Sequence, residues 1–184
     1  MWPWGHLALG YLCYHVYARR SGEAVDASAV AALALGTQLP DLVDKPLAWS
    51  LGVLPGGRSL AHSLLFGVGL ALAAVALARR FDRRDLAAPL LVGYASHLLG
   101  DSVAPIIEGA FHELAFLAWP LLALPEPSTE PSFGAHVATI GPSPMLVVEF
   151  ALVGLAAVAW LRDGKPGWGA LLTVLRRTAS ASSR

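Results

Sequence analysis

The sequence predicts an all-α protein, a polytopic membrane helical bundle with about five transmembrane helices. Of its 184 residues, 55% are hydrophobic and only 14% are charged, and the mean hydropathy is +0.57. Soluble domains carry about a quarter charged residues, so this composition is typical of a membrane protein. Five apolar segments approach the roughly 20 residues that a helix needs to cross the hydrocarbon core.

The five segments follow one another along the chain, with short polar or basic stretches between most of them. They are residues 2–18, 27–43, 60–78, 86–107 and 145–161. The first two are short and contain polar residues, so four spans result if one of them lies at the interface or is half-buried. The third is the clearest, because its apolar sequence ends directly at a loop that contains four arginines.

An irregular segment on the outer face is predicted between the fourth and fifth apolar segments. Residues 108–144 contain many prolines and have mixed polarity. Within them, residues 111–124 predict a re-entrant or interfacial helix and residues 125–144 an irregular loop. We expect residues 1–175 to form a single integral-membrane helical domain and residues 176–184, rich in Ser and Arg, to form a disordered tail.

The basic residues predict the orientation of the bundle. Eleven of the thirteen lie in segments that can face the cytoplasm, as the positive-inside rule favours. They are Arg19, Arg20, Arg79, Arg80, Arg83, Arg84, Arg162, Lys165, Arg176, Arg177 and Arg184. A multi-pass protein of the cell (inner or plasma) membrane follows, with its N-terminus outside and its C-terminus inside. Short basic clusters beside apolar runs indicate topology signals, so no nucleic-acid partner is expected.

Histidines and aspartates gather on the predicted outer side, together with the two remaining basic residues. They occur in the motifs Gly5-His6, Leu39-Pro40-Asp41-Leu42-Val43-Asp44, Arg58-Ser59-Leu60-Ala61-His62-Ser63 and Ser96-His97-Leu98-Leu99-Gly100-Asp101. His97 and Asp101 are four residues apart and therefore share one face of a helix. Ionisable groups near a bilayer are costly and are seldom there without a partner. A metal ion would pair them all.

We therefore predict a metal centre at the outer interface. The expected ligands are His6, Asp41, His62, His97 and Asp101. Imidazole and carboxylate together suit zinc, which we favour, and also manganese or iron, with one to three divalent ions. Asp44 is either a further ligand or the catalytic base that orients water. Arg58 either binds a phosphate or extends its charged end to the membrane interface. Ser63 and Ser96 either hydrogen-bond and orient the imidazoles or simply pack between helices.

The other histidines have weaker claims on this centre. His15 lies near the inner end of the first segment and is expected to be structural, whereas His112 and His136 are candidates for auxiliary ligands. Each single residue also has an ordinary interpretation, because a histidine on an apolar helix is often a hydrogen-bonded core residue and Asp41 can simply end a helix. The combination of motifs at one membrane depth favours a metal.

These four motifs resemble those of the YdjM-like inner-membrane, metal-dependent hydrolases. That family has an early G-H, an L-P-D-x-D-like turn, an R-x-x-x-H-S helix start and a G-Y-x-S-H-x-x-x-D helix, which correspond here to Gly5-His6 and residues 39–44, 58–63 and 93–101. The resemblance covers about residues 1–107 and the final apolar helix. This chain has P-D-L-V-D where the family commonly has P-D-x-D, and the stretch after Glu108 has no counterpart. The layout is also similar to that of zinc-dependent phospholipase C.

The motifs and the resemblance together imply a membrane-bound, metal-dependent hydrolase. We expect it to cleave a phosphoester of a lipid or lipid-linked substrate at the outer interface, since a bound metal activates water and polarises a phosphoryl oxygen. Two alternatives use the same residues without hydrolysis: a metal or ion transporter or sensor, and a structural protein with a polar helix interface. The oligomeric state stays open, because Gly67, Gly69 and Ala71 allow close packing within one chain or between chains.

Overall fold

The computed structural model of the protein describes residues 1–125, 132–170 and 172–173. Its elements in chain order are α1 (Pro3–Ser21), α2 (Ala27–Lys45), η1 (Pro46–Ser50), α3 (Leu64–Arg80), η2 (Arg84–Leu86), α4 (Ala87–Ile107), η3 (Phe111–Ala118), α5 (Phe133–Ala138) and α6 (Pro144–Arg162). These described residues contain helices and no strand, so the predicted all-α class is confirmed. The expected tail, residues 176–184, lies outside the described residues.

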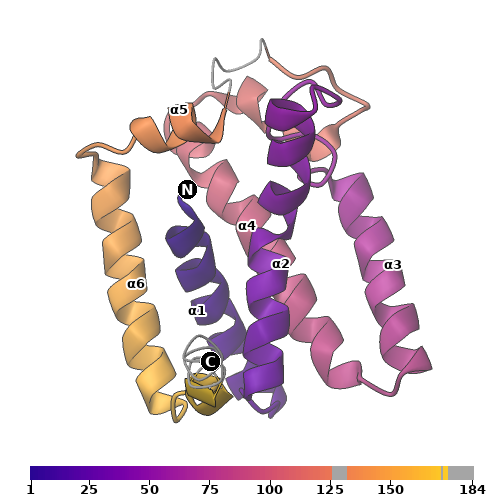
Figure 1. Cartoon of the computed structure of the whole chain (residues 1–184), viewed down its shortest axis with the longest axis vertical. Helices are drawn as coiled ribbons and strands as arrows, with labels where there is room; N and C mark the ends of the chain where they lie inside the picture. The colour runs from indigo at the N-terminus through magenta and orange to yellow at the C-terminus, as the bar shows by residue number, and fades with distance from the viewer. Residues whose placement is uncertain (126–131, 171, 174–184) are drawn as a thin grey trace, which may run out of the picture.

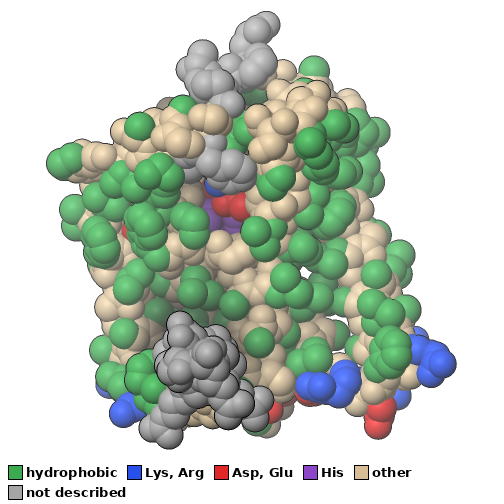
Figure 2. Space-filling view, viewed as in Figure 1, with side chains coloured by type: hydrophobic (Ala, Val, Ile, Leu, Met, Phe, Trp, Pro, Cys, Tyr) green, Lys and Arg blue, Asp and Glu red, His purple; other side chains and the backbone are tan. Residues whose placement is uncertain are grey.

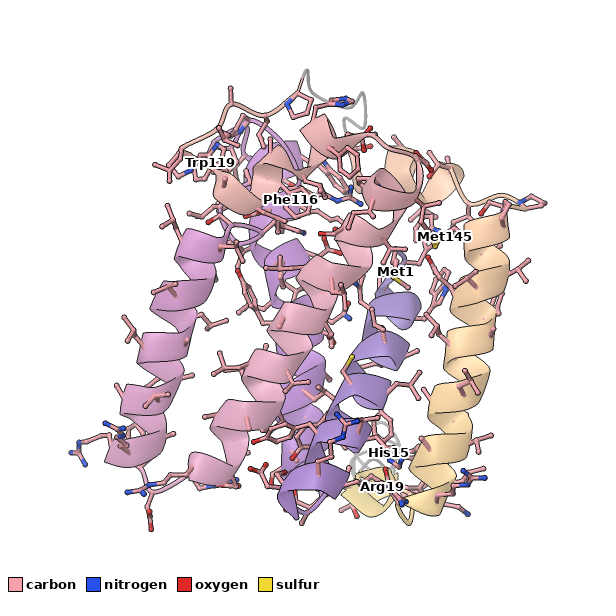
Figure 3. All side chains as sticks on the ribbon, turned by 180° about the vertical axis from the view of Figure 1, so that it is seen from behind. Met1, His15, Arg19, Phe116, Trp119 and Met145 are labelled. Atoms are coloured by element: carbon pink, nitrogen blue, oxygen red, sulfur yellow. The ribbon has the colours of Figure 1, made fainter. Side chains whose placement is uncertain are left out.

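The long helices run side by side, with α4 in contact with α1, α2 and α3, and with α6 against α1 (Figure 1). The irregular segments η3 and α5 lie over one end of this bundle. Figure 3 places Met1, Phe116 and Met145 at this end, and His15 and Arg19 at the other. We call the first the upper end and the second the basic end.

Short polar residues fix where the helices begin. Asp26, Ser63 and Ser143 precede α2, α3 and α6, and each side chain accepts a hydrogen bond from the backbone N–H three residues later. Such caps satisfy donors that have no partner within the helix. Because Ser63 caps α3, this helix begins at Leu64 and not at residue 60 as expected, and His62 lies in the preceding turn.

Fewer helices than expected meet the length and hydropathy of a membrane span. Within the described residues, two helical stretches are long and apolar enough to cross a membrane: Arg84–Ile107, with a mean hydropathy of 1.3, and Pro144–Arg162, with 2.1. Only 17% of the most apolar part of α6 is buried, whereas the core helix of a soluble protein is mostly covered. Five spans are therefore not confirmed, and α1, α2 and α3 as spans remain a prediction.

Apolar and charged side chains occupy different parts of the surface along the bundle axis. In Figure 2 hydrophobic side chains cover the sides of the molecule, basic side chains gather at the basic end, and histidine and acidic side chains are visible in a hollow near the upper end. Arg19 and Arg20 close α1, Arg79 and Arg80 close α3, and Arg162 closes α6. The separation between basic residues and the His/Asp motifs therefore holds in space, while the orientation in the membrane stays a prediction.

Two glycines let the backbones of α2 and α4 touch. A Cβ on Gly36 would lie 2.1 Å from the carbonyl oxygen of Leu90, and a Cβ on Gly93 would lie 2.4 Å from that of Leu33. Real Cβ atoms do not approach backbone so closely, so any larger residue would force the two helices apart. This contact lies about one to two turns from Asp41 and His97, which the same two helices carry.

We expect Gly36→Ala to lower the stability of the bundle by about 1–3 kcal/mol, as overpacking in a tight interior does. The measurement is the thermal unfolding midpoint of the detergent-purified protein. Gly69→Ala is the matched control, because a Cβ at Gly69 on α3 meets nothing within 4 Å. Equal midpoints for Gly36→Ala and the wild type would show that the helix contact is not tight.

Candidate metal centre

The side chains of all five predicted ligands lie together at the upper end of the bundle. His6 comes from α1, Asp41 from α2, His62 from the turn before α3, and His97 and Asp101 from α4. The three imidazoles are almost completely buried, Asp101 is 4% exposed, and the side chain of Asp41 is 12% exposed. The structure thus brings together residues that lie as many as 95 positions apart in the sequence.

Four of these residues turn one ligand atom each toward a common point. The Nε2 atoms of His62 and His97 are 3.1 Å apart. Oδ1 of Asp41 lies 3.6 Å from Nε2 of His62 and 3.9 Å from Nε2 of His97. Oδ2 of Asp101 lies 3.6 Å and 3.7 Å from the same two nitrogens. We call His62, His97, Asp41 and Asp101 the four-ligand group.

The spacing within the four-ligand group fits a metal ion. Zinc bonds of about 2.0–2.2 Å in a tetrahedron place neighbouring ligand atoms roughly 3.3–3.6 Å apart. Five of the six separations between these atoms lie from 3.1 to 3.9 Å and bracket that range. Each aspartate also belongs to a three-residue group with His97 whose ligand atoms lie within 4.8 Å of one another. The residues present therefore match the donor types and the size of a divalent ion, while the geometry does not choose between zinc and another metal.

Both imidazoles of the four-ligand group are oriented through their other nitrogen. Nδ1 of His97 lies 2.6 Å from the carbonyl oxygen of Thr37, which can only accept, so this nitrogen carries a proton. Nδ1 of His62 lies 2.8 Å from Oδ2 of Asp44. These contacts turn the Nε2 atoms toward each other and toward two carboxylates. Two Nε2 atoms that face each other at this distance suit a shared proton or a metal ion between them.

Asp44 lies outside the ligand groups and has a different set of contacts. It is completely buried and accepts hydrogen bonds from the backbone N–H groups of Ser59, Ala61 and His62, at 2.7, 2.8 and 3.3 Å. With the His62 imidazole, these contacts engage both carboxylate oxygens. Asp41 and Asp44 therefore face different partners, the first the ligand atoms and the second the turn that carries His62.

Arg58 and Lys45 each pair with one aspartate of the four-ligand group. Nε of Arg58 lies 2.8 Å from Oδ2 of Asp101, and Nζ of Lys45 lies 2.7 Å from Oδ2 of Asp41. Lys45 also lies over the ring of Trp49, at 5.5 Å from its centroid. These are the two basic residues that the sequence places on the predicted outer side, away from the other eleven. Their pairing with the carboxylates accounts for this position.

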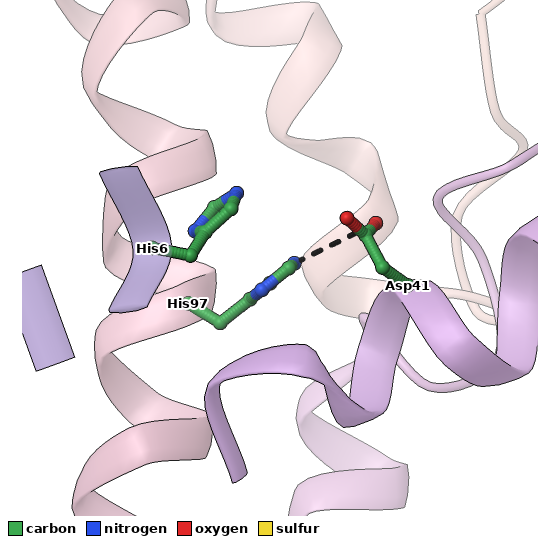
Figure 4. A group of neighbouring side chains, drawn as sticks. All are labelled: His6, Asp41 and His97. Carbon is green, nitrogen blue, oxygen red and sulfur yellow. Dashed lines mark ion pairs between the residues drawn. The ribbon is translucent and has the colours of Figure 1, made fainter. Parts of the chain in front are cut away.

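His6 stacks on His97 at a ring-centroid distance of 3.8 Å (Figure 4). With Asp41 and His97 it forms a second group whose ligand atoms lie within 4.8 Å of one another. Its Nε2 lies 3.2 Å from Oδ1 of Asp101, yet neither ring nitrogen makes a hydrogen bond of acceptable geometry. His6 therefore approaches the centre with both of its nitrogens unsatisfied.

A cavity of about 1040 Å³ reaches this centre from the upper end. Its charged and ionisable lining comprises Lys45, Arg58, Asp101, His112, Glu113 and Glu149. Apolar and aromatic side chains, including Trp49 and Phe116, complete the wall. Figure 2 shows acidic and histidine side chains in a hollow near the upper end, and the cavity lining includes Asp101 of the centre.

Glu149, which the sequence motifs do not include, lies in the same cavity wall. It is 1% exposed, and its Oε1 accepts a hydrogen bond from the backbone N–H of Trp2 at 3.1 Å. The signal that could have identified it is a single carboxylate inside the most apolar helix of the chain, since such groups in membrane spans are rarely without function.

The remaining candidate residues lie as follows. Nδ1 of His15 is 2.7 Å from Asp163 at the basic end, far from the centre along α1, in keeping with its expected structural role. His112 lines the cavity but belongs to neither ligand group. The side chain of His136 lies outside the described part of the chain. Ser63 caps α3, and the hydroxyl of Ser96 donates to the carbonyl oxygen of Gly93, so neither contacts an imidazole by a described hydrogen bond.

Comparison with known families gives one match, to the YdjM inner membrane protein family, over residues 1–177. The chain therefore belongs to this family, and the match includes the stretch after Glu108 that the sequence motifs alone left without a counterpart. Neither the curated proteins nor the solved structures contain a match. The expected similarity to zinc-dependent phospholipase C is thus not shown.

Proposed function

We propose that this member of the YdjM inner membrane protein family is a metal-dependent hydrolase that cleaves a phosphoester of a lipid or lipid-linked substrate. The observation that supports the proposal best is the convergence of two imidazole Nε2 atoms and two carboxylate oxygens at the separations of metal ligands. All four side chains are largely buried, and the group has access to a large cavity. Buried ionisable groups without a structural explanation are candidates for a functional site.

The chain supplies the ligands, their orientation and the groups that bind phosphate. A divalent ion held by the four-ligand group would lower the pKa of bound water to about 7 and polarise a phosphoryl oxygen. Asp44 and Thr37 hold the His62 and His97 rings, which keeps both Nε2 atoms available. We therefore assign Asp44 a positioning role, since its oxygens already accept from the turn.

Arg58 and Lys45 suit the binding of an anionic substrate. In the structure they neutralise Asp101 and Asp41, but a bound cation would take over that compensation and release both side chains toward the cavity that they line. A guanidinium matches two phosphate oxygens in a fixed plane, and an ammonium adds a point charge. The side chain of Arg58 is 46% exposed, so it can reach a substrate without leaving a buried position.

A lipid or lipid-linked substrate fits the surroundings of the cavity. The cavity lies at one end of helices that include two candidate membrane spans, and α6 contributes Met145 and Glu149 to its wall. Other apolar side chains of α6, such as Val147, Phe150 and Leu155, are exposed. A phosphoester at the headgroup level would thus reach the four-ligand group while its apolar chain stays beside α6.

Removal of metal should abolish hydrolysis, and its return should restore it. The full chain, purified in detergent, is treated with a chelator and assayed with a chromogenic phosphodiester and with phospholipid in mixed micelles. We expect activity to fall by at least about 10³-fold, since a metal contributes several kcal/mol of transition-state stabilisation. Zinc, manganese and iron(II) are then added singly. Full activity in protein verified as metal-free would end the proposal.

The transporter or sensor alternative makes a different prediction in the same preparation. It predicts metal flux in liposomes, or metal binding alone, with no turnover of either substrate. No described contact favours it over hydrolysis, while the open cavity with two basic residues beside the ligands favours a bound anionic substrate.

A further inference from the structure

Two buried side chains beside the four-ligand group have unsatisfied polar atoms. His6 has no hydrogen bond at Nδ1 or Nε2, and Glu149 has none at Oε2, although both residues are only 1% exposed. Burying a polar group without a partner costs free energy, and burying a charged one costs more. Within the described residues, no ion pair between Glu149 and a basic residue is present. Glu149 therefore lacks a cation that would compensate its buried charge, and His6 offers two ring nitrogens without a hydrogen bond.

The contacts of residues 1 and 2 connect Asp101 with Glu149. Oδ1 of Asp101 lies 3.2 Å from Nε2 of His6 and accepts from the N-terminal ammonium of Met1 at 3.0 Å. The next main-chain nitrogen, that of Trp2, donates to Oε1 of Glu149. The two carboxylates are thus connected through neighbouring backbone atoms, and Asp101 and Glu149 line the same cavity.

Two glycines leave room for these side chains and for that of Met1. A Cβ on Gly5 would lie 2.9 Å from Cε of Met1 and 3.0 Å from the carboxyl carbon of Glu149. A Cβ on Gly100 would lie 2.8 Å from Sδ of Met1 and 3.2 Å from Nδ1 of His6. A larger residue at either position would displace the methionine together with the glutamate or the imidazole. The G-H motif at the start of α1 therefore admits Glu149 beside its histidine.

The two oxygens of Asp101 have different neighbours. Its Oδ2 belongs to the four-ligand group, whereas its Oδ1 faces His6 and the N-terminal ammonium of Met1. A carboxylate that divides its oxygens in this way can bridge two ions about 3.5–4 Å apart, the spacing of two-metal sites that act on phosphate esters.

We propose that His6, Asp101 through Oδ1, and Glu149 form a second divalent-cation position next to the four-ligand group. This inference rests on the metal centre of the proposed function and extends it from one ion to two. Imidazole with two carboxylates suits zinc or manganese. The second ion takes the place of the Met1 ammonium at Oδ1 of Asp101, satisfies the free atoms of His6 and Glu149, and compensates the buried charge of the glutamate.

The test is the zinc content of the full chain, measured by elemental analysis after loading and removal of free metal. We expect two zinc ions per chain for the wild type and one for Glu149→Gln, which keeps an oxygen for the Trp2 N–H but loses the charge. Glu113→Gln is the matched control, because Glu113 is an exposed carboxylate in the same cavity wall and should leave two ions.

Any other zinc content of the wild type or of Glu149→Gln overturns the inference. Two ions in Glu149→Gln would show that the glutamate holds none, and no ion in that variant would show that it supports the fold instead. One ion in the wild type would remove the second position altogether. Two ions in a wild type that hydrolyses no phosphoester would leave this inference in place and reject the hydrolase proposal, so the two can fail separately.

Discussion

Replacing His97 by alanine should remove the metal from the four-ligand group and reduce hydrolysis by about 10³-fold or more. Nε2 of His97 lies 3.1 to 3.9 Å from the three other ligand atoms, so the substitution removes one of the four ligands, the imidazole that α4 supplies. A metal contributes several kcal/mol to the stabilisation of the transition state, and each 1.36 kcal/mol corresponds to a factor of ten in rate. Metal content and phosphodiester turnover are measured on the same purified sample.

His112→Ala is the control for this variant. His112 also lines the cavity, but it is exposed and belongs to neither ligand group, so its loss should leave the metal content unchanged. A His97→Ala protein that keeps both its metal and its turnover would reject the four-ligand group. Loss of metal without any wild-type turnover would instead support binding without hydrolysis.

Replacing Asp44 by alanine should have the second large effect, on stability and on metal affinity together. The change leaves three backbone N–H groups of the turn and Nδ1 of His62 without an acceptor. Each buried donor without a partner costs about 1–3 kcal/mol, so several kcal/mol are expected in total. Loss of a residue that orients a metal-bound histidine typically weakens metal binding by about 10–100-fold.

The thermal unfolding midpoint and a zinc titration test this expectation. Glu108→Ala serves as the control, because Glu108 is an exposed carboxylate at the end of α4 with no described side-chain hydrogen bond. If Asp44→Ala unfolds at the wild-type temperature and binds zinc as tightly, the turn does not depend on this carboxylate.

The sequence was sufficient to predict the helical class and to select the side chains that meet at the upper end. Local patterns carry this information: the apolar runs predict helices, and the four-residue spacing of His97 and Asp101 sets them on one face. Local patterns do not determine the number of membrane spans, because that number depends on which helix faces contact lipid. The helices α1, α2 and α3 do not meet the combined length and hydropathy that α4 and α6 reach.

The roles of individual residues depended on contacts that no local pattern contains. The separate partners of Asp41 and Asp44 follow from the path of residues 46–62, which returns the turn to α2. The sequence does not predict the place of Glu149, because its neighbours Gly5 and Trp2 lie 144 and 147 positions earlier in the chain. Lys45 and Arg58 are the two basic residues outside the predicted cytoplasmic segments, but the sequence does not reveal that each pairs with an aspartate.

The glycine contact between α2 and α4 leaves no layer of side chains that could slide or repack between the two backbones. Thr37 follows Gly36 directly and holds the His97 ring, and Asp41 comes four residues later on the same helix. Two of the proposed metal ligands, His97 and Asp41, therefore lie on a rigid frame whose geometry does not depend on a bound ion. Little conformational entropy is then lost when a ligand sphere closes around it, which is the advantage of a preorganised receptor.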